Sequence, residues 1–182
     1  MKFFILTSLS FLFISTTVLA SDKHKITFPL SKGEKSISFD FSGEIYKSGN
    51  FIEITEKSNN EIASFIAKVI SSNASGEKQK ILSLWSDRHK DTIDSAMSNP
   101  KALKLNTALF NNMKASKLLG YIEYGDYIIC YVHHDLNGKD EPYLKEYPLE
   151  TKGGALRLTN DLSGDIFFSQ ISRTLAKYIW SQ

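Results

Sequence analysis

The sequence predicts an α+β fold with an N-terminal β-hairpin, helices packed on a curved four-stranded antiparallel meander, and a C-terminal helix. Three observations lead to this prediction. Apolar residues alternate in twos near the start of the chain and again after residue 118, which is typical of strands with a buried face. Between residues 58 and 116 they recur at helical spacing. Because helices and strands occupy separate stretches, we expect the helices to cover one face of an antiparallel sheet.

The first segment, residues 1–20, has the pattern of a signal peptide. Lys2 gives it a short basic start, and residues 3–14 form an apolar core that is too short to span a bilayer comfortably. Ala20 is a small residue where a signal peptidase would cut, so we expect cleavage between Ala20 and Ser21. The rest, residues 21–182, is then exported to the periplasm or the medium as one α+β domain without stable membrane insertion. An uncleaved membrane anchor is the alternative.

The charge and the cysteine content of the chain limit which partners and which cysteine chemistry the protein can have. The chain has 22 Lys and Arg and 20 Asp and Glu, and loss of Lys2 leaves 21 cations against 20 anions, a net charge of +1. This balance argues against a nucleic-acid partner, which favours a clustered basic excess. Cys130 is the single cysteine, so no intramolecular disulfide can form. Its setting in "YIICYV" predicts a buried small hydrophobe rather than a nucleophile.

Residues 25–54 are expected to form an N-terminal β extension. Apolar residues alternate over 26–30 and again over 37–41, and the turn-like sequence 31–34 lies between them. This pattern predicts a hairpin with one buried face. A further short strand is predicted over 51–54.

The helical region is expected to span residues 58–116. Ser58 is the predicted N-cap of its first helix, because Glu61 three residues later completes a capping-box pattern. The sequence Asn-Ala-Ser-Gly at 73–76 breaks that helix, and a second helix follows directly. A further helix over 100–113 begins with proline, which the first turn of a helix tolerates.

Residues 118–160 predict the antiparallel meander. Its four strands are "LLGYIEY", "YIICYVHH", "YLKEYPL" and "ALRLT", separated by Gly-Asp, Asn-Gly and Lys-Gly-Gly turns. Residues 164–180 then predict a closing amphipathic helix. Asp165 lies near its start, where the helix dipole favours an acidic side chain.

Residues 60–164 resemble the nuclear transport factor 2-like (cystatin-like) superfamily in the order of their elements, namely helices followed by "GYIEYGDYIICYVHH…YLKEYPLE…GALRLTNDL". The resemblance implies a curved sheet whose concave side holds the helices and often encloses a pocket. It also implies that the chain can form a homodimer. The hairpin at 25–41 and the C-terminal helix depart from the superfamily's pattern. Since the superfamily includes enzymes, ligand carriers and interaction modules, the resemblance implies no particular activity and no catalytic motif.

The adjacent pair His133 and His134 is the first candidate site. Two imidazoles that bind one metal ion must both reach to about 2 Å from it, whereas neighbours in a strand point to opposite faces. We therefore predict that these histidines do not chelate together, even with Asp135 beside them. The acidic stretch 135–141 lacks the full spacing of a calcium loop, and hairpin chemistry already explains its Asn-Gly. We expect no metal and no cofactor.

A second candidate is "WSDRHKD" at residues 85–91. Here Asp87 or Asp91 could orient His89 as a general base. No serine or cysteine is tied to this histidine by spacing. An ordinary polar helix end has the same composition, and that is the interpretation we favour.

The third candidate is a set of aromatic residues on the predicted meander. Tyr127, Tyr131, Tyr143 and Tyr147, with His133, are predicted to share one face of adjacent strands. Tyrosines at this period usually pack a sheet against helices. If this face instead lines a concavity, it provides an apolar wall with hydroxyl donors for a small organic or sugar ligand. These five residues are therefore the candidate ligand-binding residues.

Two functions remain open from the sequence. The favoured one is an exported domain that binds a small ligand or a protein partner without catalysis, because no set of nucleophile, base and orienting group is evident. The alternative is a pocket enzyme of hydrolase or isomerase type, with His133 or His89 as the base and a tyrosine as the proton donor.

Overall fold

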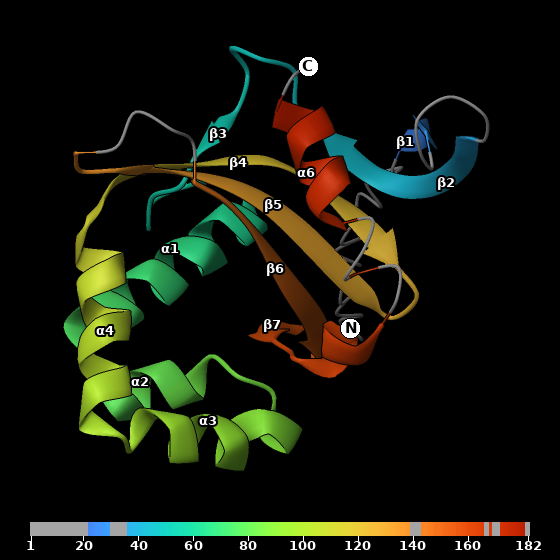
Figure 1. Cartoon of the computed structure of the whole chain (residues 1–182). Helices are drawn as coiled ribbons and strands as arrows, with labels where there is room; N and C mark the ends of the chain where they lie inside the picture. Colours follow the sequence, from blue (N-terminus) through green and yellow to red (C-terminus); the bar gives the residue numbers. More distant parts are fainter. Residues whose placement is uncertain (1–21, 30–35, 139–142, 166–167, 169–171, 181–182) are drawn as a thin grey trace, which may run out of the picture.

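The computed structural model describes residues 22–29, 36–138, 143–165, 168 and 172–180 (Figure 1). The predicted signal peptide, the spacer at 31–34 and residues 139–142 of the acidic stretch lie outside the described residues.

Strands and helices follow one another much as predicted. The strands are β1 (Asp22–Pro29), β2 (Ser36–Ile45), β3 (Ile52–Glu53), β4 (Met113–Tyr124), β5 (Tyr127–Leu136), β6 (Tyr143–Lys152) and β7 (Ala155–Leu158). The helices are α1 (Glu61–Ser75), α2 (Lys78–Ser83), α3 (Lys90–Met97), α4 (Pro100–Asn111) and α6 (Ser172–Trp180), with 3₁₀ turns η1 (Asp87–His89) and η2 (Asp161–Gly164). None of the helices in the described part of the chain is long and apolar enough to cross a membrane.

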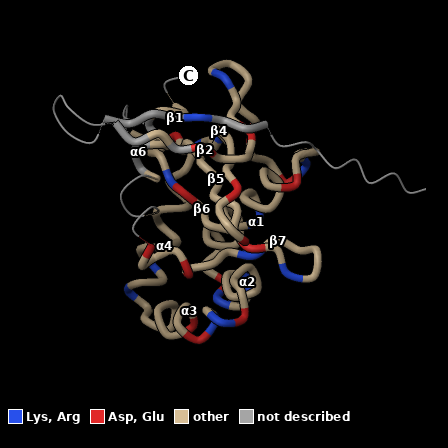
Figure 2. Tube along the Cα trace, turned by 90° about the vertical axis from the view of Figure 1, so that its right-hand side faces the viewer, with Lys and Arg blue, Asp and Glu red and all other residues tan. Residues whose placement is uncertain are grey.

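All the named strands belong to one antiparallel sheet. Its order is β1-β2-β4-β5-β6-β7, and β3 also pairs with β4. The meander β4 to β7 is the predicted one, and the N-terminal hairpin joins its edge through the pairing of β2 with β4. The fold is α+β, as the sequence predicts. Basic and acidic residues are interspersed along the described trace (Figure 2).

Helices cover both faces of this sheet (Figure 1). Helices α1 to α4 lie on one face and α6 on the other, so the expectation that one face holds all the helices is wrong for α6. The physical reason is that the central strands are apolar on both faces. Leu118 and Leu119 of β4 are both fully buried, as are Cys130 and Tyr131 of β5, and they point to opposite sides. A sheet of this kind needs cover on each face.

Each face has its own apolar cluster. The cluster on the α1 side comprises Ile62, Ala63, Phe65, Ile66, Val69, Leu84, Leu118, Cys130, Val132, Tyr147, Leu149, Leu156 and Leu158. The cluster on the α6 side comprises Phe41, Leu119, Ile122, Ile129, Tyr131, Leu162, Leu175, Ala176 and Ile179.

Two predicted boundaries of the helical region are wrong. Helix α4 ends at Asn111 and Met113 already belongs to β4, because its backbone pairs with Leu136 of β5. At the other end, the N-cap of α1 is Asn60 and not Ser58. The Asn60 side chain accepts a hydrogen bond from the Ala63 backbone nitrogen at 2.9 Å. The Ser58 hydroxyl instead accepts a hydrogen bond from the Asn60 backbone nitrogen, just before the helix begins.

The junction between the hairpin and the meander requires glycine. A side chain on Gly120 of β4 would place its first carbon 2.4 Å from the carbonyl oxygen of Glu44 in β2. The same carbon on Gly43 of β2 would lie 2.1 Å from the carbonyl oxygen of Tyr121. Both residues have positive φ. The hairpin can therefore join the sheet here only because neither strand carries a side chain at the crossing.

Candidate functional site

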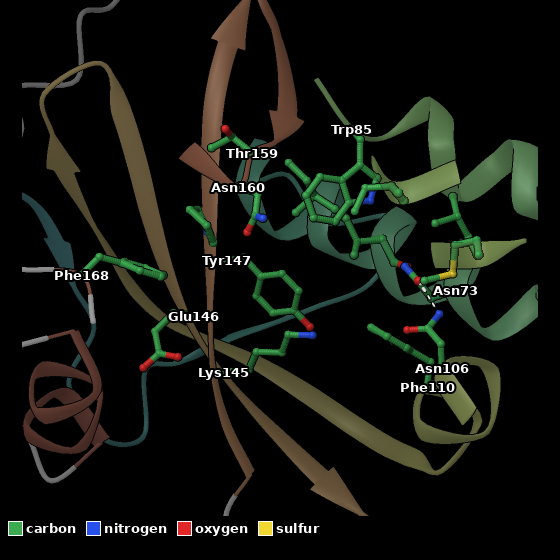
Figure 3. Close-up of a pocket in the computed structure, with 16 residues that line it drawn as sticks. Asn73, Trp85, Asn106, Phe110, Lys145, Glu146, Tyr147, Thr159, Asn160 and Phe168 are labelled. Carbon is green, nitrogen blue, oxygen red and sulfur yellow. Dashed lines mark hydrogen bonds between the residues drawn. The ribbon is translucent and has the colours of Figure 1, made fainter. Parts of the chain in front are cut away.

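A cavity of about 360 Å³ lies between β6 and the helices on the α1 side of the sheet (Figure 3). Its lining comes from segments far apart in the sequence, and most of it is apolar. The described lining residues are Val69, Asn73, Ile81, Trp85, Ile93, Met97, Asn106, Phe110, Lys145, Glu146, Tyr147, Pro148, Leu158, Thr159, Asn160 and Phe168.

The helical wall of the cavity is fixed by an amide pair. Asn106 of α4 donates a hydrogen bond from Nδ2 to Oδ1 of Asn73 on α1, at 2.7 Å. Asn73 in turn donates to the carbonyl oxygen of Val69 at 2.7 Å. Asn73 is buried, so these bonds satisfy a polar side chain that packing alone would not tolerate. The pair joins α1 to α4 and holds the wall in place.

The sheet wall of the cavity is formed by alternate residues of β6. Lys145 and Tyr147 extend from one side of the strand toward Asn106 and Phe110, and Glu146 extends from the other side (Figure 3). The Lys145 ammonium lies 5.1 Å from the centroid of the Phe110 ring and 4.9 Å from that of Tyr147. Burial lowers the pKa of Lys145, and the charge of Glu146 opposes this shift.

A buried histidine lies within hydrogen-bonding distance of the Tyr147 hydroxyl. Nε2 of His134 lies 3.0 Å from the Tyr147 hydroxyl, and its Nδ1 lies 2.7 Å from the hydroxyl of Ser116 in β4. Burial lowers the pKa of His134 to about 3, and Lys145 and His133 add to the shift. The ring is therefore neutral near pH 7, donating through one nitrogen and accepting through the other. This chain of three side chains fixes the Tyr147 ring that faces the cavity.

The structure divides the five predicted ligand-binding residues between the two faces. Tyr127, Tyr131 and His133 share a face, as strand alternation predicts, but they lie on the α6 side. Tyr147 pairs with Cys130 and Tyr143 with His134, which places both tyrosines on the α1 side. The prediction of one common face is wrong because the register between β5 and β6 sets Tyr147 opposite Cys130 rather than opposite Tyr131. Of the five, Tyr147 lines the cavity.

His133 and His134 lie on opposite faces, as predicted. His133 packs on Trp180 of α6 with 4.1 Å between ring centroids, and its Nε2 lies 3.4 Å from the Asp135 carboxylate. Both histidines are buried, so neither faces the solvent. No group of three or more potential metal ligands occurs among the described residues.

His89 is held by a carboxylate that the sequence did not indicate. Its Nε2 lies 2.8 Å from Oδ1 of Asp161 and 3.2 Å from the hydroxyl of Thr159, both about 70 positions later in the chain. The alternative in which Asp87 or Asp91 orients this ring does not hold, since Asp161 takes that place and the Asp87 carboxylate pairs with Lys90 and Lys152.

Asp161 is the centre of this polar cluster at the end of the sheet. Its other carboxylate oxygen accepts from Tyr127 at 2.9 Å and pairs with Arg88 at 2.8 Å, and Arg88 also pairs with Glu150. Burial acts to raise the pKa of Asp161, but its hydrogen bonds and the Arg88 charge lower it overall.

The geometry of His89 does not fit a base that acts on Thr159. Because Asp161 accepts a hydrogen bond from Nε2, that nitrogen carries the proton. The Thr159 hydroxyl faces the same nitrogen and cannot deliver a proton to it. These contacts of Nε2 therefore hold η1 against η2 and do not activate Thr159 as a nucleophile.

Cys130 is fully buried in the α1-side cluster, as the sequence predicts. Burial raises the pKa of its thiol well above the ordinary value. Since the thiolate is the reactive form of cysteine, this residue acts as a packing group.

No family model and no curated protein matches the chain. The resemblance to the nuclear transport factor 2-like superfamily stays a prediction. Sequence reasoning overlooked the helical wall of the cavity and Lys145. The available signal for Lys145 was its place between Tyr143 and Tyr147 at the period of a strand, which puts a cation on an otherwise apolar face.

Proposed function

We propose that this protein binds a small, largely apolar organic ligand in the cavity between β6 and helices α1 to α4, without catalysing a reaction on it. The observation that carries this proposal is the cavity itself, whose surface is mostly apolar and carries polar side chains between the apolar ones. Sites for small molecules have this composition, and their volumes begin at roughly 300 Å³.

The volume limits the size of the ligand. At about 30 Å³ for each water-sized group, a cavity of about 360 Å³ accommodates on the order of ten non-hydrogen atoms. The wall favours an aliphatic chain or a ring system over a sugar, because most of its surface is apolar. Trp85, Ile81 and Phe110 provide flat and branched apolar surface for such a ligand.

The positions of the histidines favour binding over catalysis. None of the described residues that line the cavity is a histidine. His133 lies across the sheet against Trp180, and His89 is bonded to Asp161. A pocket enzyme with either histidine as its base would need that ring in the cavity, within hydrogen-bond reach of a substrate.

Calorimetric titration with small apolar probes tests the proposal. Suitable probes are naphthalene-2-carboxamide and octanamide, together with the corresponding carboxylates. We expect at least one probe to bind, and Met97→Trp, which fills the cavity from α3, to weaken that binding at least about tenfold. Leu105→Trp is the matched control, because Leu105 is 63% exposed on α4 and does not line the cavity.

Two results would remove the proposal. One is that no probe binds the unsubstituted protein. The other is that Met97→Trp and Leu105→Trp change the affinity equally, which would place binding outside the cavity.

A further inference from the structure

Lys145 is the one cation among the described residues that line the cavity. It makes no ion pair with any of the residues that the structure describes. Its ammonium lies against the Phe110 and Tyr147 rings, whose faces attract a cation but do not neutralise it.

The carboxylate in the described lining, that of Glu146, makes no ion pair with this ammonium. Glu146 follows Lys145 in β6, so its side chain extends from the opposite side of the strand (Figure 3). The polar groups behind Tyr147 are those of Ser116 and a neutral His134. A half-buried ammonium that lies against aromatic rings and has no ion pair among the described residues is an energetic cost to the folded chain, and a bound anion lowers that cost.

We infer that the ligand of this cavity is a small organic monoanion, whose carboxylate-like head binds the Lys145 ammonium while its apolar body contacts Trp85 and Ile81. This inference rests on the proposed function and specifies its ligand class. One ammonium on a flexible stem suits a single charge. The described lining contains no arginine that would hold a doubly charged phosphate through two parallel hydrogen bonds.

The aromatic contacts favour an anion site over a covalent amine site. A lysine that attacks a carbonyl carbon must first lose its proton. Burial lowers the pKa of Lys145, whereas the Phe110 and Tyr147 rings and the charge of Glu146 act in favour of its protonated form, which donates hydrogen bonds to an anion.

Matched pairs of probes test this inference near neutral pH, where a carboxylate is ionised. Naphthalene-2-carboxylate is compared with naphthalene-2-carboxamide, and octanoate with octanamide, so that shape is kept and charge is removed. The first pair reports a ring-binding cavity and the second a chain-binding one. We expect each carboxylate that binds to do so about ten- to a hundredfold more tightly than its amide, as is typical of hydrogen bonds to charged groups.

Substitutions of Lys145 assign this preference to one side chain. Lys145→Met keeps the length of the stem, and it is expected to abolish the preference for the carboxylate while leaving the affinity for the amide within about threefold. Lys145→Arg is expected to retain the preference. Lys104→Met is the control for total charge, because Lys104 is exposed on α4 and does not line the cavity.

The outcomes separate the two proposals. If both members of a pair bind equally and Lys145→Met changes neither affinity, the monoanion inference is overturned and binding in the cavity stands. An equal loss in Lys104→Met and Lys145→Met would also overturn it, since the effect would then come from total charge. If no probe binds, or Met97→Trp has no effect on binding, the proposed function fails as well.

Discussion

Acidification is expected to destabilise the protein through His134. The ring is fully buried between Ser116 and Tyr147, and burial lowers its pKa to about 3. In the unfolded chain the same imidazole has a pKa of about 6.5. Below that value the unfolded state binds a proton that the folded state does not, so the free energy of unfolding falls as the pH falls.

The size of this effect follows from the two pKa values. Each pH unit between them contributes about 1.4 kcal/mol, so a change from about pH 8 to about pH 5 costs roughly 2 kcal/mol at this one residue. The remainder is lost only as the pH approaches the folded-state pKa of about 3. A loss of 2 kcal/mol is a large share of the stability of a typical domain.

Urea unfolding of the unsubstituted protein and of His134→Gln, each at about pH 8 and about pH 5, measures the effect. Glutamine keeps a polar side chain beside Ser116 and Tyr147 but does not titrate. We expect the free energy of unfolding to fall by about 2 kcal/mol less in His134→Gln than in the unsubstituted protein. All other groups titrate in both proteins, so this difference belongs to His134. Equal falls in the two proteins would refute the reasoning, whatever the absolute stability of His134→Gln.

Three further predictions concern the framework of the fold and are checked by chemical denaturation. Gly120→Ala should cost about 1–3 kcal/mol, because the added methyl group meets the carbonyl oxygen of β2 at 2.4 Å; an unchanged midpoint would contradict this close approach. Asn60→Ala should cost about 1 kcal/mol and Ser58→Ala clearly less; the reverse order would make Ser58 the cap of α1. Asp161→Ala should cost about 1–3 kcal/mol, whereas Asp91→Ala, at an exposed position of α3, should cost little; similar losses would mean that the contacts of Asp161 do not hold the end of the sheet.

Local pattern was enough to predict the fold class. Period-two and helical spacing are properties of consecutive residues, so the sequence indicated the meander, the helical region and the burial of Cys130. The same alternation separated His133 from His134 and thereby argued against a shared metal ion. Element ends were less accurate, since Ser58 and Asn60 are both good caps and only the folded backbone selects Asn60.

The position and the lining of the cavity depend on the tertiary structure. Alternation determines which residues of one strand share a face, but it does not determine which face of the next strand lies beside it. The register that sets Tyr147 opposite Cys130 moved Tyr147 and Lys145 to the α1 side, away from Tyr131. Likewise, Asp161 reaches His89 only because two distant turns meet at the end of the sheet. The sequence by itself thus determined the elements and their apolar faces, whereas long-range packing, which no local period encodes, decided where a cation would face an apolar cavity.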